Sequence, residues 1–139
     1  MKSLRTAIII YILAILLTAC GGNPSADQGA QLEGPTWVLT AINKSAPIEG
    51  TAPTIEFADG QVSGNASCNS FGGSYELDGD SISFGAMFMT EMYCMDPEGA
   101  MDQEMLYLEM LGKAKSFEIS EGILTIIIEA QQTLTFEQQ

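Results

Sequence analysis

The sequence of 139 residues contains no histidine and only five cations against eighteen carboxylates, which gives a formal net charge of −13. Without histidine, the chain lacks the base that most often activates a serine or cysteine nucleophile, and it lacks the commonest metal-binding side chain. So few cations cannot neutralise a phosphodiester backbone. We therefore expect no catalytic residue, no metal or other cofactor, and no nucleic-acid partner.

The longest apolar run is too short for a comfortable transmembrane helix, which needs ~20 residues. It covers residues 7–17, follows Lys2 and Arg5, and ends in Leu-Thr-Ala-Cys at Cys20. A short positive region, an apolar region and small residues before a cysteine are typical of a lipoprotein signal peptide. We expect residues 1–19 to be removed and Cys20 to carry palmitate-type chains. A transmembrane anchor and ordinary secretion are the alternatives.

The expected mature chain is even more acidic, since without Lys2 and Arg5 it keeps three lysines against eighteen carboxylates, a formal charge of −15. Anionic headgroups would repel such a body, so we expect a monomer attached to the outer membrane or cell membrane only through its lipid, on the extracytoplasmic side. Residues 21–31 show no hydrophobic pattern. We therefore assign residues 20–34 to the lipidated cysteine and a flexible tether, and residues 35–139 to one domain.

Cysteine is scarce, and the three that occur can be accounted for without reactive chemistry. If Cys20 is lipidated, Cys68 and Cys94 remain, 26 residues apart. A disulfide between them would stabilise the fold by roughly 3 kcal/mol by restricting the unfolded chain. Two buried free thiols are the alternative. A reactive thiol is disfavoured because it needs a neighbouring base.

Short alternating segments separated by turn residues predict a mainly β domain. Asp59-Gly60, Asp78-Gly79 and Glu121-Gly122 are typical hairpin turns. The expected strands are residues 37–42, 54–57, 61–64, 74–77, 81–84, 87–93, 116–119, 123–128 and 133–136. Together they indicate a small antiparallel β-barrel or strongly curved sheet.

One helix is expected between the sixth and seventh of these strands. Asp96 is a candidate N-cap, Pro97 suits the first helical position and Gly112 is a candidate C-terminal stop. Methionine and leucine recur at helical spacing and predict the face that packs on the sheet. These residues are Met101, Met105, Leu108 and Leu111.

Several stretches together resemble the META domain of HslJ-like bacterial envelope proteins. They are WVLTAI from Trp37, the run TIEFADGQVSGNASCNSFGGSYELDGDSISF, MTEMYCMD, and a closing SFEISEGILTIII with TLTF. The resemblance covers residues 37–136 and implies a mainly β fold with one helix and a loose association with heat or envelope stress. It implies no known catalytic activity.

The same resemblance assigns structural roles to individual residues. Gly64 would allow a tight backbone path, and the amide of Asn69 would hydrogen-bond backbone in the turn at Cys68. Trp37, Phe71 and Tyr75 would pack in the core. Gly73 and Thr90 complete the matching motif residues. The family usually has glycine just before the first cysteine of the domain, where this chain has Ser67.

A methionine-rich stretch offers a different function. Residues 87–95 contain four methionines beside Cys94, and thioethers suit Cu(I) or Ag(I). In a strand, however, Met87, Met89 and Met95 would lie on one face and Met92 on the other, so that the ligands would not converge. We therefore expect these methionines to pack in the core or at a sheet edge. The acidic segments 78–81 and 96–104 lack the ligand spacing of an EF-hand.

These observations favour a non-enzymatic, lipid-anchored envelope protein that presents a β module to an unidentified envelope protein. One alternative is a lipidated inhibitor of a basic hydrolase such as lysozyme, which a body of this charge would attract. The other is the soft-metal carrier.

Overall fold

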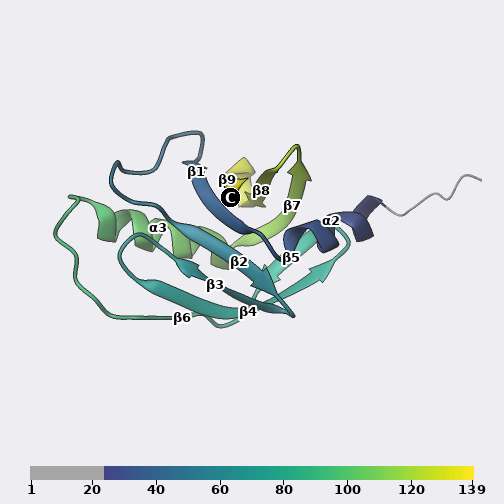
Figure 1. Cartoon of the computed structure of the whole chain (residues 1–139), viewed down its shortest axis with the longest axis horizontal. Helices are drawn as coiled ribbons and strands as arrows, with labels where there is room; N and C mark the ends of the chain where they lie inside the picture. Colours follow the sequence, from purple (N-terminus) through teal and green to yellow (C-terminus); the bar gives the residue numbers. More distant parts are fainter. Residues whose placement is uncertain (1–23) are drawn as a thin grey trace, which may run out of the picture.

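Nine strands and two α-helices make up most of residues 24–139, the part of the chain that this computed structural model describes (Figure 1). In chain order they are helix α2 (Pro24–Leu32), strands β1 (Thr36–Ile42), β2 (Thr54–Ala58), β3 (Gln61–Asn65), β4 (Ser70–Asp78), β5 (Ser81–Phe84) and β6 (Phe88–Met89), helix α3 (Ala100–Gly112), strands β7 (Ala114–Ser120) and β8 (Ile123–Ile128), the 3-10 turn η1 (Glu129–Gln131), and strand β9 (Thr133–Gln138).

Eight of the strands close into an antiparallel barrel. The strand order is β3-β2-β1-β9-β8-β7-β5-β4-β6, and a further pairing of β3 with β4 completes the ring and leaves β6 outside it. The seam between β5 and β7 is short, with the register pair Ser81–Ser116 and a 2.9 Å hydrogen bond from the Phe117 N–H to the Asp80 carbonyl. The predicted barrel with a packed helix is therefore confirmed.

The barrel core consists of the inward-facing residues, which alternate with outward-facing ones along each strand. Phe57 of β2, Leu124 of β8 and Phe136 of β9 are buried in it, as is Trp37. From α3, Tyr107 reaches the same interior, where its ring centroid lies 5.8 Å from that of Phe71 and 6.2 Å from that of Phe136. Helix α3 thus contributes a side chain to the barrel core.

Helix α3 buries a different face from the one that its hydrophobic residues predict. Its buried residues are Ala100, Gln103, Glu104, Tyr107, Met110 and Leu111. Of the predicted stripe, only Leu111 is buried, Met101 and Leu108 are half-buried, and Met105 is exposed. The helix also starts later than expected, at Ala100, because its N-cap is Gly99 with a φ of 84°. The physical reason for the rotated face is the hydrogen bonding of Gln103 and Glu104, described below.

The strand expected over residues 87–93 is also wrong, apart from the two residues of β6. The Thr90 N–H still donates to the Ser70 carbonyl, at 3.0 Å. Beyond that point the backbone of Met92 is hydrogen-bonded to the side chain of Asn69 instead of to a neighbouring strand. The chain therefore leaves the sheet and crosses to α3 as a loop.

Within the tether predicted for residues 20–34, the described residues 24–34 are helical or hydrogen-bonded to the domain. Residues 24–32 form α2, Leu32 is fully buried, and the Trp37 indole N–H donates to the Leu32 carbonyl at 2.9 Å. The Tyr75 hydroxyl donates to the Glu33 carboxylate. The Gly34 N–H also donates to the Phe57 carbonyl, at 3.3 Å. Leu32 is the one buried apolar residue among residues 28–34, so a search for periodic hydrophobicity does not find the segment. Cys20 lies outside the described residues. Neither α2 nor α3 is long and apolar enough to span a bilayer.

Candidate interaction surface

A buried carboxylate organises the loop between β3 and β4. Glu104 of α3 is 1 % exposed. Its Oε2 accepts hydrogen bonds from the Cys68 N–H at 3.0 Å and the Asn69 N–H at 2.6 Å, and its Oε1 accepts one from the Asn69 amide at 2.8 Å. A buried charge is tolerated only when it is fully hydrogen-bonded. These three bonds meet that condition and fix the loop against α3.

Asn69 connects this carboxylate to the segment that follows β6. Its Oδ1 accepts from the Met92 N–H at 2.7 Å and from the Thr90 hydroxyl at 2.8 Å, and its Nδ2 donates to the Met92 carbonyl at 3.1 Å. The expected backbone bonds of Asn69 therefore exist, but to residues more than twenty positions away. Thr90, a motif residue without an assigned role, is part of the same network.

A disulfide between Cys68 and Cys94 joins the two loops covalently, with the Cα atoms 6.0 Å apart. The structure thus contains the predicted bridge and not the alternative of two free thiols. Cys68 is buried and Cys94 is half-buried. We call the group of Cys68, Asn69, Thr90, Cys94 and Glu104 the buried polar cluster, after its buried members Cys68, Asn69 and Glu104; Thr90 is exposed at its edge.

The other motif residues lie where the resemblance implies. A Cβ at Gly64 would lie 2.0 Å from the Thr54 carbonyl oxygen, so only glycine fits there. A Cβ at Gly73 would meet the Ala86 carbonyl at 3.0 Å. Phe71 and Tyr75 are buried in the core, and the ring of Tyr75 packs edge-on against Phe57.

Outside the buried polar cluster, the same loop exposes large apolar side chains. Phe88, Tyr93 and Met95 are 73 %, 81 % and 80 % exposed, and Met89 and Met92 are also exposed. The packing expected of the methionines holds for Met87, which is half-buried against the core, and for Met89, which lies in the edge strand β6. Met92, Tyr93 and Met95 are exposed on the loop beyond β6, where the backbone of Met92 is bonded to Asn69 and not to a neighbouring strand.

Helix α3 continues this apolar area. A hollow of about 300 Å³ between β6 and α3 is lined by Phe71, Met87, Phe88, Met89 and Leu108. Met105, which is 68 % exposed, lies one turn before Leu108 on the same helix face. We call Phe88, Met89, Met92, Tyr93, Met95 and Met105 together the methionine surface.

Acidic residues are interspersed with the methionine surface. Glu91, Asp96, Glu98 and Asp102 are all exposed. No lysine or arginine occurs between Lys44 and Lys113. The arrangement is an apolar area with negative charge at its margin.

The part of the chain that forms this barrel, with its core helix and the linked Cys68 and Cys94 loops, matches the model of a known family. The family model described as "META domain" matches residues 30–139. The chain belongs to the META domain family. The match starts ahead of Trp37, which agrees with the docking of Leu32 and Glu33 into the domain.

This META domain is similar to heat shock protein HslJ of Escherichia coli K12, with 27 % identity over 127 residues that cover 90 % of this chain and 89 % of HslJ. An NMR structure of a protein from Burkholderia xenovorans superposes with a TM-score of 0.68 at 26 % identity and covers 88 % of this chain and 92 % of that one. A crystal structure of a DUF4847 family protein from Bacteroides vulgatus shares the fold, with a TM-score of 0.56, 13 % identity, and coverage of 79 % of this chain and 96 % of the other.

Ser67, at which this META domain departs from the usual glycine, has a φ of 142°. That backbone conformation favours glycine. The Ser67 N–H donates to Asn65 Oδ1 and its hydroxyl accepts from the Gln103 amide, both at 3.0 Å. The second bond, which a glycine would lack, helps to hold the strained turn.

Gln103 and Glu104 are the site residues that sequence reasoning missed, because polar side chains were assigned to the outer face of the helix. Besides Ser67, Gln103 bonds the Ile48 N–H at 2.6 Å and the Thr51 hydroxyl at 2.8 Å. A usable signal was the spacing of Ala100, Tyr107 and Leu111, which places residues 103 and 104 on the buried face of α3.

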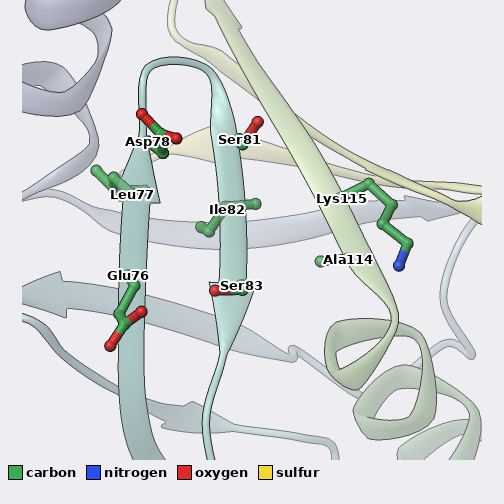
Figure 2. A pocket seen from close by; sticks show the side chains of 8 residues that line it. All are labelled: Glu76, Leu77, Asp78, Ser81, Ile82, Ser83, Ala114 and Lys115. Carbon is green, nitrogen blue, oxygen red and sulfur yellow. The ribbon is translucent and has the colours of Figure 1, made fainter.

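The second candidate location in this META domain is a hollow of about 290 Å³ at the barrel seam (Figure 2). Figure 2 shows Ile82 and Ala114 between the strands, with Glu76 and Asp78 on β4. The Lys115 ammonium points away from both carboxylates and pairs with Glu129 at 3.0 Å. The polar groups therefore do not converge on a ligand.

Within residues 24–139, no three Cys, Asp or Glu side chains are grouped to hold a metal ion. The sulfur of Cys94 is committed to the disulfide, so the soft-metal alternative would depend on thioethers alone.

Proposed function

We propose that this META domain is a lipid-anchored, non-enzymatic part of a bacterial cell envelope that binds another envelope protein through the methionine surface. The observation that carries the proposal is the location of this surface on a loop fixed by the buried polar cluster. Several neighbouring apolar side chains held in water are typical of an interaction site. A loop with no such role would gain by folding them inward.

A non-enzymatic role is supported by how the polar cluster is used. Both oxygens of Glu104 and the amide of Asn69 are bonded to backbone or to each other. Nucleophilic catalysis needs a base within reach of a free nucleophile, whereas these groups are occupied in holding two loops together. The proposal includes a stress-related role, which the name of the relative HslJ suggests.

The lipid anchor rests on the sequence around Cys20. Cys20→Ser is expected to abolish labelling with a palmitate analogue and to release the protein from membranes. Cys68→Ser serves as the matched control and retains the label. Labelling of the Cys20→Ser protein would overturn the anchor.

The binding role is tested by photocrosslinking in intact cells. A photoreactive residue replaces Tyr93 on the methionine surface or, as a control, Glu121 in the β7–β8 turn, since both positions are exposed. We expect one envelope protein, identified by mass spectrometry, to be captured from position 93 and not from position 121. Equal capture from both positions, or none from position 93, would contradict the proposal.

The inhibitor alternative is separated by an enzyme assay. Inhibition of lysozyme by the purified protein at low ionic strength would overturn the proposed function in favour of that alternative. Steering by net charge weakens steeply with added salt, so the assay includes a high-salt arm.

A further inference from the structure

The residues around the methionine surface also indicate the chemistry of its partner. We infer that this surface binds a basic amphipathic helix of an envelope protein. The inference rests on the proposed function and adds the charge and the secondary structure of the bound segment.

The apolar part of the surface suits the nonpolar face of a helix. Methionine side chains are unbranched and polarisable, so they adapt to differently shaped apolar partners. Phe88 and Tyr93 add aromatic rings, which often dominate binding energy at interfaces. Both rings are largely exposed and are therefore available to a partner.

The acidic residues around the methionine surface favour a positively charged partner. Glu91, Asp96, Glu98 and Asp102 flank or interrupt the apolar residues. The two ion pairs found within residues 24–139, Lys113–Glu109 and Lys115–Glu129, involve other carboxylates. Lysines or arginines beside the apolar face of a partner helix would complement the four carboxylates.

A helix fits the backbone better than an added strand. Strand addition needs a row of free backbone N–H and C=O groups along a sheet edge. Strand β6 has only two residues, and the Met92 N–H and C=O are both bonded to Asn69. The edge therefore offers too little backbone to pair with an extended peptide.

Two hollows beside the exposed face of α3 also suit side chains that project from a helix. The hollow of about 300 Å³ that ends at Leu108 lies on one side of Met105. A second hollow, of about 480 Å³, includes Ile48, Asp102 and Leu106 on the other side of α3. Apolar anchors at helical spacing would enter such hollows along the exposed ridge of α3.

Two other occupants are disfavoured. A second copy would bring together two chains that each carry a formal charge of −13 and the same acidic margin. Anionic lipid is disfavoured for the same reason. In addition, Figure 1 places the β6–α3 loop at the end of the molecule opposite α2, the helix that follows Cys20 in the sequence. This part of the surface therefore lies far from α2.

The test uses the complete lipidated protein in nanodiscs of zwitterionic lipid, with empty nanodiscs subtracted. The probe is a fluorescent Leu/Lys amphipathic helix of about 18 residues. Its controls are a scrambled peptide of the same composition and a Leu/Glu version. We expect the Leu/Lys helix to bind at least about tenfold more tightly than either control. Its affinity should fall several-fold between about 50 mM and about 300 mM salt.

Two pairs of variants locate the site. Tyr93→Ser with Met95→Gln should weaken binding about tenfold, whereas Ile123→Gln, which removes an exposed apolar residue from β8, should leave it unchanged. Glu91→Gln with Asp96→Asn should reduce the salt dependence, whereas Glu121→Gln with Glu137→Gln should not. Methyl NMR of methionine should show shifts at Met95 and Met105 but not at buried Met110.

Equal binding of the helical and scrambled peptides would overturn the inference, as would unchanged binding by the Tyr93→Ser, Met95→Gln protein. Failure here is distinguishable from failure of the proposed function. Capture of an envelope protein from position 93 without binding of the basic helix would overturn only the inferred chemistry. Binding of the helix without capture in cells would overturn the proposed function, on which the inference rests.

Discussion

The two faces of α3 each contain residues that break the usual relation between polarity and burial, although Tyr107, Met110 and Leu111 on the inner face follow it. The inner face buries Gln103 and Glu104 beside Tyr107, while the outer face exposes Met105 and Leu106. The inner polar groups are needed because the β3–β4 loop presents backbone N–H groups that only an acceptor on α3 can satisfy. The apolar side chains of the outer face are exposed to solvent and are not part of the domain core. The difference teaches that hydrogen-bonding demand decides the burial of Gln103 and Glu104, and that Met105 and Leu106 remain accessible, as the proposed partner would require.

The largest expected effect on stability comes from removing the Glu104 carboxylate from the inner face of α3. Glu104→Ala leaves the Cys68 N–H, the Asn69 N–H and the Asn69 amide without their acceptor. Each of these donors that is not hydrated instead costs about 1–3 kcal/mol of stability. Allowing for relaxation, we expect a loss of about 3–5 kcal/mol in the free energy of unfolding, measured by urea denaturation of the oxidised protein. Glu104→Gln, which keeps one acceptor oxygen, should lose less. A loss below about 1 kcal/mol for Glu104→Ala would mean that the cluster is not structural.

Opening the covalent link between the loops should have the next largest effect. Replacing both Cys68 and Cys94 by serine removes the constraint on the unfolded chain and should lower stability by about 3 kcal/mol. Amide hydrogen exchange over residues 88–95 should accelerate more than exchange in β8, because the disulfide ties this loop directly. Uniform acceleration throughout the domain would contradict a specific role in fixing the methionine surface.

Matched methionines on α3 test the comparison most directly. Met110→Ala creates a cavity in the core and should cost at least about 2 kcal/mol, whereas Met105→Ala should change stability by less than about 0.5 kcal/mol. Thermal or urea unfolding of both proteins measures the difference. Similar losses at the two positions would show that the outer face is packed in solution.

The smallest effect is a dependence on alkaline pH. Burial raises the pKa of Tyr107, and burial together with the hydrogen bond to Glu33 raises the pKa of Tyr75. Both phenols therefore stay protonated in the folded state at a pH where the unfolded chain ionises. This contribution to stability is fully present below about pH 10 and is lost above it, at up to about 1.4 kcal/mol per pH unit for each tyrosine.

The matched variant for this prediction is Tyr75→Phe. Unfolding measured between about pH 9 and about pH 11 should show a shallower decline than in the wild type, because one titrating group is gone. An unchanged slope would mean that Tyr75 does not titrate differently in the two states.

Local pattern predicted most of the strands because each depends on nearby residues. Asp59-Gly60 and Glu121-Gly122 adopt the positive φ values that a tight hairpin turn requires, 50° and 73° in the first and 53° and 77° in the second. Two pairings join segments that are far apart in the sequence, β1 with β9 and β5 with β7, and no local pattern indicates them. Their identity emerges only from the packed structure.

The candidate site was predictable in part. Cys68 and Cys94 followed from cysteine counting and Asn69 from the family resemblance. The acceptor for Asn69 lies 35 residues away on α3, and no local rule connects them. Hydrophobic periodicity then chose the wrong face of that helix, because it assumes that apolar residues are buried. The same assumption hid the methionine surface.

The docking of α2 has a consequence for a protein anchored at Cys20. Three residues separate Cys20 from Pro24, and even a fully extended chain covers at most ~14 Å over four residue steps. If Cys20 carries the proposed lipid, this short linker would keep the domain within a thin layer of solvent next to the headgroups. A partner would then have to reach that layer or lie in the same membrane.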